Sequence, residues 1–129
     1  MTEDYVSFKT AKLLKEKGFP QYKKEDGFVG LKYNVNGELT TAPYAEHYAA
    51  PSLHRAIKWM RENGFHIYAP MEIDYDEDER GDKWYHDAAY YPEIRRVSDG
   101  KIMYDDGTLY TTPEQACEVA IRYCLENYF

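Results

Sequence analysis

Tyrosine decides whether this chain can bury a hydrophobic core. The 129 residues include 14 tyrosines, whereas leucine, isoleucine, valine and phenylalanine together number only 23. So few aliphatic residues, combined with a net charge of −7, are typical of disordered chains. Tyrosine, tryptophan and methionine raise the large apolar set to about a third of the sequence. We therefore expect residues 1–129 to fold as one domain of ordinary size, with tyrosines in its core.

The acidic residues are concentrated in one segment, and the overall charge excludes several functions. A general nucleic-acid-binding protein would present a basic stripe, which an acidic chain lacks. No stretch approaches the roughly 18 consecutive apolar residues of a membrane helix. The first residues carry no secretory signal, so we expect a cytosolic protein. Residues 72–82 hold seven acids against one arginine: Glu72, Asp74, Asp76, Glu77, Asp78, Glu79 and Asp82.

Three helices are marked by signals at their ends. Ser7, Ser52 and Thr112 are predicted N-caps, because a hydroxyl oxygen can accept from the free amides of the first turn. Gly18 and Gly64 are predicted to end the first two helices, since glycine adopts the left-handed conformation that stops a helix. A phenylalanine follows each of these glycines, placed to pack back onto its own helix.

Alternating residues and turn signals predict the strands. Asn36-Gly37 is expected to form a two-residue hairpin turn in which both residues have positive φ. Pro70 favours an edge position or a bulge, because proline donates no ladder hydrogen bond. Pro43–Pro51 and Asp76–Asp82 are interpreted as loops. The predicted strands are Phe28–Asn34, Glu38–Ala42, His66–Tyr75, Lys83–Tyr91, Ile94–Val97 and Lys101–Tyr104.

These elements predict an α+β fold. The expected order is helix, two strands, helix, two to four strands, helix. Short turns between strands favour antiparallel neighbours. We expect a mostly antiparallel sheet of about four to six strands with three helices packed on it. In the first hairpin, Val29, Leu31 and Tyr33 are predicted to face inward, and Lys32 to face outward.

No motif predicts a metal site or a catalytic centre. An EF-hand reading that starts at Asp76 places Arg80 where a ligand oxygen is required, between flanks that read as strands rather than helices. Cys117 and Cys124 lie on one helical face and are interpreted as core residues. We therefore assign no catalytic, metal-binding or cofactor-binding residue and expect no cofactor. The four histidines show no helical zinc spacing: His47, His54, His66 and His86.

Two groups of residues are candidates for an interaction surface. Tyr44, Tyr48 and Tyr68 fall in a loop or on strand faces opposite the apolar rows. Tyrosine offers a large contact area at low entropic cost, so exposed tyrosines are typical of binding surfaces. The acidic segment supplies the second group. Its candidate residues are Asp76, Glu77, Asp78 and Glu79.

Three segments of the chain have a recognisable sequence. The first is V-S-F-K-T-A-K-L-L-K-E-K-G-F at residues 6–19, and the second runs from Ala50-Pro51 through I-K-W-M-R-E to Phe65-His66-Ile67. The third, at residues 110–127, contains E-Q-A-C-E-V-A-I-R-Y-C-L-E-N. Together these segments resemble small proteins, without an assigned activity, from phages and prophages of gut Bacteroidetes. The resemblance implies a mobile-element origin and the cytosol of a bacterial host. It implies no reaction.

Three hypotheses for function follow. The first is a non-catalytic accessory or protein-interaction domain that binds a host or phage protein. The second is an acidic mimic or inhibitor that engages a basic, nucleic-acid-binding surface of a host protein, in which case binding weakens with salt. The third is a metal-dependent hydrolase, which requires the four histidines to converge with acids in a cleft. Oligomeric state and strand order are left open by the sequence.

Overall fold

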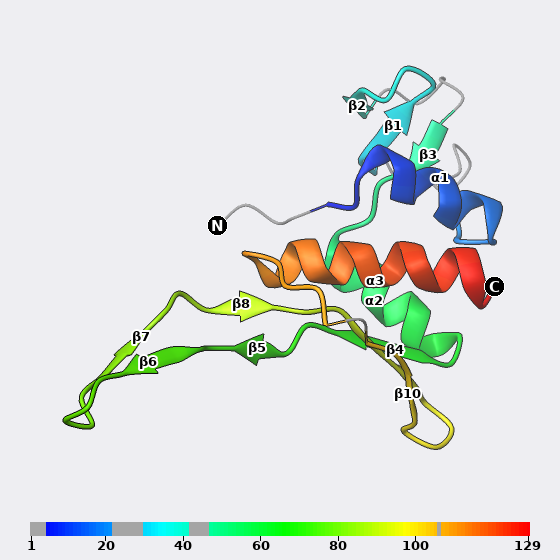
Figure 1. Ribbon diagram of the computed structural model, residues 1–129. Helices are drawn as coiled ribbons and strands as arrows, with labels where there is room; N and C mark the ends of the chain where they lie inside the picture. The colour runs from blue at the N-terminus through cyan, green and yellow to red at the C-terminus, as the bar shows by residue number, and fades with distance from the viewer. Residues whose placement is uncertain (1–4, 22–29, 42–46, 106) are drawn as a thin grey trace.

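The protein has an α+β fold, as the sequence predicts, with three helices and antiparallel strands in the part of the chain that the structure describes (Figure 1). The computed structural model describes residues 5–21, 30–41, 47–105 and 107–129. None of its helices is long and apolar enough to cross a lipid bilayer, within those residues. The strands form two three-stranded sheets and two two-stranded ribbons, where the sequence predicts one larger sheet.

All three predicted N-caps are confirmed. Ser7 Oγ accepts the Thr10 amide at 3.3 Å, and Ser52 Oγ accepts the Arg55 amide at 3.2 Å. Thr112 caps the last helix in the same way, and Pro113 occupies its first turn, where a missing N–H costs nothing. The helices are α1 (Phe8–Glu16), α2 (Leu53–Glu62) and α3 (Pro113–Asn127).

The predicted glycine endings are also confirmed. Gly18 has φ 101° and Gly64 has φ 98°, the left-handed conformation that ends a helix. After α1, the Phe19 amide donates to the Leu14 carbonyl at 2.8 Å and the Gly18 amide donates to the Lys15 carbonyl at 3.2 Å. This pair of bonds is a Schellman motif, and it turns Phe19 into the core, where it is 3 % exposed.

The first sheet has the strand order β2-β1-β3 and packs on α1. Residues 47–49 form a strand, so the prediction of a loop over Pro43–Pro51 is wrong there; residues 43–46 lie outside the described residues. Lys32 is only 4 % exposed, which contradicts its predicted outward position. Residues 28, 29 and 42 of the predicted hairpin also lie outside the described part. The strands are β1 (Lys32–Asn34), β2 (Leu39–Thr40) and β3 (His47–Ala49).

The turn between β1 and β2 differs from the predicted two-residue turn. Only Gly37 has positive φ, at 82°. The Asn34 amide donates to the Glu38 carbonyl, and the Gly37 amide donates to the Asn34 carbonyl. The Asn34 side chain accepts the amides of Asn36 and Glu38, which favours a three-residue loop that needs a single left-handed glycine.

The second sheet lies under α2 and α3, with the strand order β10-β9-β4. Ile67 pairs with Ile94, and both side chains are buried on the face that meets the helices. Tyr68 pairs with Glu93 on the opposite face, because successive side chains of a strand alternate. The strands are β4 (Phe65–Tyr68), β9 (Glu93–Arg96) and β10 (Ile102–Tyr104).

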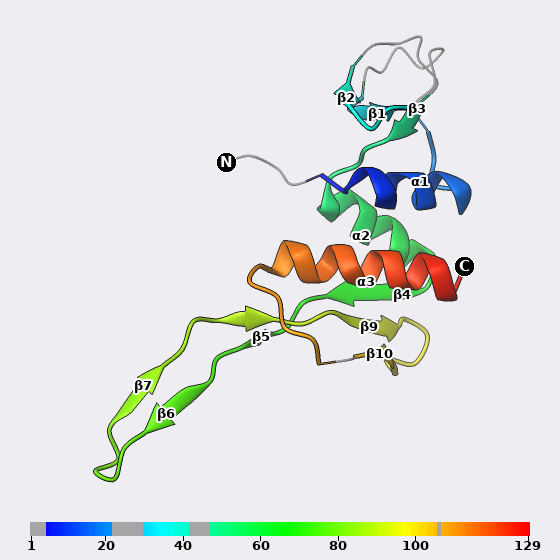
Figure 2. The same cartoon turned by 45° about the horizontal axis from the view of Figure 1, so that its top comes forward.

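Helix α3 occupies the centre of the molecule. It contacts α1 on one side, α2 beside it, and strands β4 and β9 on the other side (Figure 2). Cys117 and Cys124 are buried and free, as predicted. Aromatic rings close the end of this core: Tyr128 stacks on Phe65 at 5.5 Å, and Phe129 stacks on Trp59 at 5.4 Å. The expectation of tyrosines in the core holds only in part: no described tyrosine is among the buried residues, but several are partly buried and pack against the aliphatic core, namely Tyr33, Tyr48, Tyr104, Tyr123 and Tyr128.

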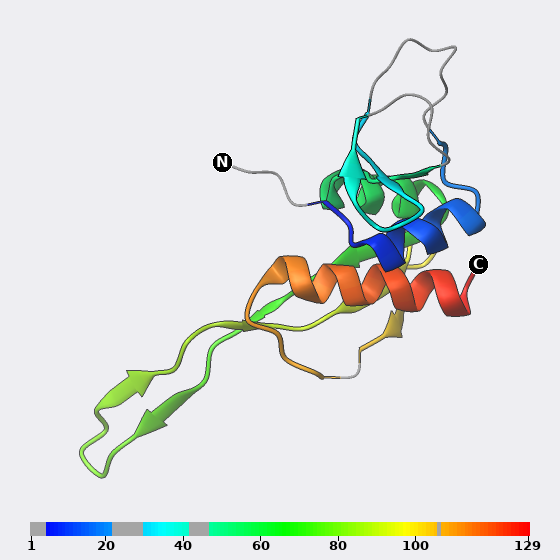
Figure 3. The same cartoon turned by 90° about the horizontal axis from the view of Figure 1, so that it is seen from above.

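Four short strands form an arm, in which β5 pairs with β8 at the base and β6 pairs with β7 farther out. The arm leaves the second sheet and projects away from the helices (Figure 3). The arm, residues 70–91, begins at Pro70, shortly after β4 ends at Tyr68. The prediction of one strand over His66–Tyr75 is therefore wrong, and so is the prediction of one strand over Lys83–Tyr91. The strands are β5 (Met71–Glu72), β6 (Tyr75–Glu77), β7 (Lys83–Tyr85) and β8 (Ala89–Tyr90).

Candidate interaction surface

Backbone hydrogen bonds hold the arm together from its base to its end. The Tyr91 amide donates to the Pro70 carbonyl at 3.2 Å, and the His86 amide donates to the Asp74 carbonyl at 2.9 Å. The side of the arm that contains β7 and β8 has one extra residue. Glu72 pairs with Ala89 and Asp74 lies opposite His86, so residues 87 and 88 face the single residue 73. This bulge explains why the returning strand is interrupted. At about 3.3 Å per residue, the arm extends roughly 30 Å.

The end of the arm is a tight turn built on Asp78. The Asp78 amide donates to the Asp82 carbonyl, and the Gly81 amide donates to the Asp78 carbonyl. Asp78 Oδ1 accepts the amides of Arg80 and Asp82, at 2.9 and 3.0 Å. Gly81 has φ 87°. The turn after Asn34 has the same hydrogen-bond pattern, in which a side-chain oxygen accepts the amides two and four residues later. Asp78 therefore has a structural role in shaping the turn.

The two faces of the arm carry different side chains. Tyr75 lies opposite Tyr85, with their ring centres 5.6 Å apart, and Lys83 Nζ lies 4.8 Å from the centre of the Tyr75 ring. We call this the tyrosine face. The other face carries Trp84 opposite Asp76, and we call it the tryptophan face. These aromatic side chains are largely exposed: Tyr75 is 48 %, Trp84 52 % and Tyr85 66 % exposed.

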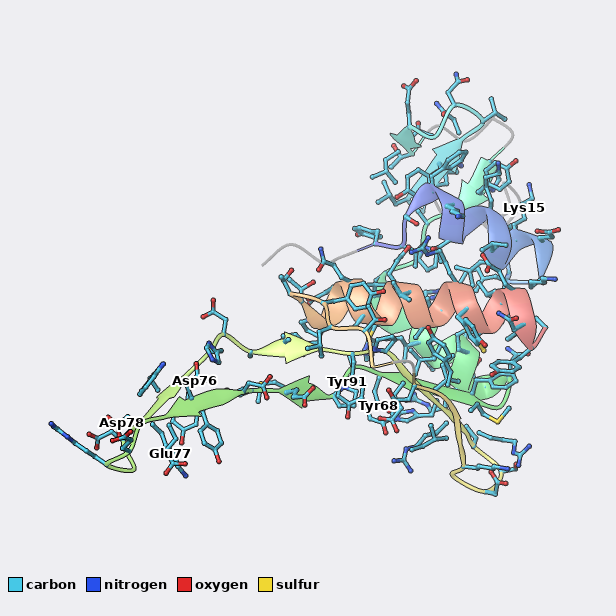
Figure 4. All side chains as sticks on the ribbon, in the orientation of Figure 1. Lys15, Tyr68, Asp76, Glu77, Asp78 and Tyr91 are labelled. Atoms are coloured by element: carbon cyan, nitrogen blue, oxygen red, sulfur yellow. The ribbon has the colours of Figure 1, made fainter. Side chains whose placement is uncertain are left out.

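The outer half of the arm is acidic. Asp76 Oδ2 lies 2.9 Å from His86 Nε2 across the ribbon, and both side chains are more than half exposed. Figure 4 shows Asp76, Glu77 and Asp78 together near the end of the arm, far from the helices. A contact between two side chains this exposed adds little to stability. The acidic side chains at the end of the arm are exposed and can be reached by a binding partner.

A buried carboxylate anchors the base of the arm. The Glu93 side chain is 6 % exposed, and its Oε1 lies 3.3 Å from Arg95 Nη2. Arg95 Nε also donates to the Tyr68 hydroxyl at 2.7 Å. Burial, and a hydrogen bond with Glu93, raise the pKa of Tyr68. The network joins the last residue of β4 to the first strand after the arm.

A hollow of about 290 Å³ lies at the base of the arm. Its lining includes Met71, Glu72, Tyr91 and Asp105. Burial raises the pKa of Tyr91, and the nearby carboxylates of Glu93, Asp105 and Glu72 raise it further. The acidic character of the arm therefore continues to its base.

A second hollow, of about 400 Å³, lies where the three helices begin. Its lining includes Ser7, Leu53, Thr112 and Glu118. Glu118 Oε1 accepts the Ser7 amide at 2.8 Å and the Thr10 hydroxyl. These polar groups cap the helices or join them to one another, so their role in this region is structural.

The structure brings together only part of the predicted surface. Asp76, Glu77, Asp78 and Glu79 are exposed at the end of the arm. Asp76 and Glu77 belong to β6, so the predicted loop over Asp76–Asp82 is too long; the turn occupies residues 78–82. The exposed aromatic residues of the arm are absent from the predicted surface: Tyr75, Trp84 and Tyr85. The sequence signal that could have indicated them is an aromatic strand on each side of a D-x-x-G turn.

The predicted tyrosines lie elsewhere. Tyr48 is half-buried on β3, against Phe8 of α1, with Lys15 Nζ 4.9 Å from its ring centre. Tyr68 does lie opposite the apolar row, as predicted, but it is half-buried and engaged by Arg95. Tyr44 lies outside the described residues. Among the described residues, the exposed aromatic side chains of the arm therefore lie apart from Tyr48 and Tyr68.

The structure assembles no metal site from the residues it describes. No group of three or more histidine, cysteine, aspartate or glutamate side chains there could hold a metal ion. The histidines are distributed over β3, α2, β4 and the arm. In the EF-hand reading, Asp78 is a ligand, but its Oδ1 is engaged by backbone amides.

The two cysteines are not reactive nucleophiles. Burial raises the pKa of Cys117 to about 11 and that of Cys124 to about 12. Because the thiolate is the nucleophilic form, both thiols are protonated and inert at neutral pH. We expect the folded protein to react slowly with a thiol reagent such as dithiobis(nitrobenzoate), and the unfolded protein to react at both cysteines at once. Rapid labelling of Cys124 in the folded state would contradict its burial.

Comparison of the chain with models of known protein families, with curated proteins and with solved structures finds no match.

Proposed function

We propose that this chain is a non-catalytic protein-interaction domain, and that its arm is the element that binds the partner. The observation that supports this best is the exposure of Trp84 and Tyr85, at 52 % and 66 %. Tryptophan and tyrosine supply much of the binding energy at protein interfaces. A ribbon of two strands is only marginally stable alone in water, so a partner that covers the arm also stabilises it.

Site-specific crosslinking tests this proposal. A photoreactive phenylalanine derivative in place of Tyr85 is expected to trap a discrete partner protein in cells that carry the chain. The matched control places the same group at Val97, which is 52 % exposed in the turn after β9, away from the arm. The trapped protein is then purified and titrated with the unmodified chain.

The titration identifies the arm as the binding element. The double variant Trp84→Ala and Tyr85→Ala is expected to weaken binding at least about tenfold. Its far-UV circular dichroism should be unchanged, because both side chains are exposed. Equal crosslinking from positions 85 and 97, or undiminished binding by the double variant, argues against the proposal.

An acidic mimic or inhibitor is the second candidate, and the acidic end of the arm favours it. Such a protein would bind a basic, nucleic-acid-binding surface, and binding should fall steeply with salt. The test replaces Asp76, Glu77 and Glu79 with their amides and leaves Asp78, which shapes the turn, unchanged. Binding that is insensitive to both salt and these substitutions rejects the candidate. The described residues supply no metal site that would support a metal-dependent hydrolase.

The origin and location of the protein are part of the same proposal. The resemblance to small proteins of Bacteroidetes phages and prophages supports a mobile-element origin. The partner is then a host or phage protein in the bacterial cytosol.

A further inference from the structure

The arm has one open edge that is chemically distinct from the other. Backbone hydrogen bonds join Asp74 to His86 and Asp78 to Asp82. Asp74 and Asp78, on either side of β6, therefore turn their backbone groups toward the strand that contains β7. In an antiparallel pair these residues alternate with residues whose backbone groups point outward. Tyr75 and Glu77 therefore direct their N–H and C=O groups away from β7, along the outer edge of β6.

The opposite edge of the arm is already paired at its base, and its outer strand is less acidic. At its base, Tyr90 exchanges two backbone hydrogen bonds with Tyr110, of 2.8 and 2.7 Å, so the outer side of β8 is already paired. Farther out, β7 begins with Lys83. Within the part of the chain that the structure describes, β6 pairs only with β7. The outer edge of β7 is likewise unpaired within the described residues, so charge distinguishes the two edges: β6 carries Asp76 and Glu77, whereas β7 carries Lys83 and no acid.

We propose that the β6 edge accepts an extended, basic segment of the partner protein as a third strand of the arm. This inference rests on the proposed function of the arm and names the chemistry of its partner. Main-chain hydrogen bonds to Tyr75 and Glu77 would supply the pairing, as in other cases of strand addition. Alternating basic side chains would meet Asp76 on the tryptophan face or Glu77 on the tyrosine face.

Charge complementarity selects this occupant over a second copy of the chain. Two β6 strands paired with each other would place Asp74, Asp76 and Glu77 near the same acids, and like charges on adjacent strands repel. A basic strand reverses this interaction. The Trp84 ring adds a surface on which an arginine can stack beside the Asp76 carboxylate.

A synthetic peptide tests the inference. The probe is an acetylated, amidated peptide of about eight alternating arginine and valine residues, long enough for one strand. We expect it to bind the full chain with an affinity that falls as salt is added. The amide resonances of Tyr75 and Glu77 should shift in nitrogen-15 spectra, and both amides should become protected from solvent exchange. A peptide with N-methyl groups on alternate residues keeps the charge but loses the ladder donors, and it should bind at least about tenfold more weakly.

Two matched variants distinguish the effect of the acids of the arm on peptide binding from the effect of the net charge of the protein. The triple variant Asp74→Asn, Asp76→Asn and Glu77→Gln should weaken peptide binding about tenfold. The control variant changes the net charge equally at three exposed acids of the helices, and it should bind almost normally. Its substitutions are Glu62→Gln, Glu114→Gln and Glu126→Gln.

Several results would overturn the inference. One is equal binding of the N-methylated peptide, and another is equal weakening by the two triple variants. A third is resonance shifts confined to the β7 edge. Sedimentation that shows a dimer of the free chain, abolished by the arm variant, would assign the edge to a second copy instead. Crosslinking through Tyr85 with no peptide binding at the β6 edge rejects this inference and retains the proposed function. Absence of arm-dependent crosslinking rejects the proposed function itself.

Discussion

Replacement of Ile121 by alanine is expected to lower the free energy of unfolding by about 3 kcal/mol. Ile121 is fully buried on α3, the helix that contacts both other helices and the second sheet. The loss combines the apolar transfer energy of the deleted groups with the cavity that remains. Urea unfolding of the variant and the parent, followed by far-UV circular dichroism, measures the difference.

An exposed valine provides the control for this prediction. Val97 is 52 % exposed, so Val97→Ala should change the free energy of unfolding by no more than about 0.5 kcal/mol. A loss below about 1 kcal/mol for Ile121→Ala would mean that α3 does not form the centre of the core.

Replacement of Arg95 by alanine is expected to cost about 2 kcal/mol, between the values for exposed and for fully buried ion pairs. The Arg95 side chain is 43 % exposed, but its partner Glu93 is only 6 % exposed. Removal of the guanidinium therefore leaves a buried carboxylate without its counter-charge, and the Tyr68 hydroxyl without its donor. Urea unfolding at neutral pH measures the loss, and hydrogen exchange in β5 and β8 should accelerate because the base of the arm is loosened.

A double variant separates the buried charge from the lost packing. Glu93→Gln removes the charge that Arg95→Ala leaves uncompensated, so the combined variant should be more stable than Arg95→Ala alone. Tyr68→Phe, which keeps the ring beside His66, should cost about 1 kcal/mol. A combined variant that is less stable than Arg95→Ala would show that the buried charge is not the cause.

Local chemistry made the helix ends predictable. The hydroxyls of Ser7, Ser52 and Thr112 accept amides within the next turn, and Gly18 and Gly64 have the positive φ that such endings require. These interactions span three to five residues, so they can be identified without knowledge of the fold. The hairpin at Asn36-Gly37 was predicted at the right place but with the wrong turn, because the Asn34 side chain favours a longer loop.

The arm shows where local pattern is insufficient. Ile67, Met71, Ile73 and Tyr75 alternate as a strand with one buried face would. Ile67 is 1 % exposed, whereas Met71, Ile73 and Tyr75 are 59 %, 44 % and 48 % exposed. The pattern is continuous through Pro70, but the helices that cover β4 do not extend over β5 and β6 (Figure 1). Alternation indicates that a strand has two different faces, and it does not indicate whether anything covers them.

The candidate surface was also predictable only in part. The acidic residues 76–79 were identified from charge alone, and they are exposed at the end of the arm. The aromatic residues beside them, Trp84 and Tyr85, were not identified, because tryptophan and tyrosine are residue types that are also common in hydrophobic cores. Tyr68 was placed correctly opposite the apolar row, but its contact with Arg95 comes from a strand 27 residues away.

The sequence by itself determined the α+β class, the three helices with their caps, the turn-forming glycines, the need for aromatic residues in the core, and the acidic segment. These follow from interactions between near neighbours and from composition. Only the tertiary structure decided how the strands divide into sheets and which aromatic side chains are buried. It also decided that residues 70–91 leave the core as an arm. These properties depend on contacts between distant segments, which determine whether a given face of a strand meets a helix or water.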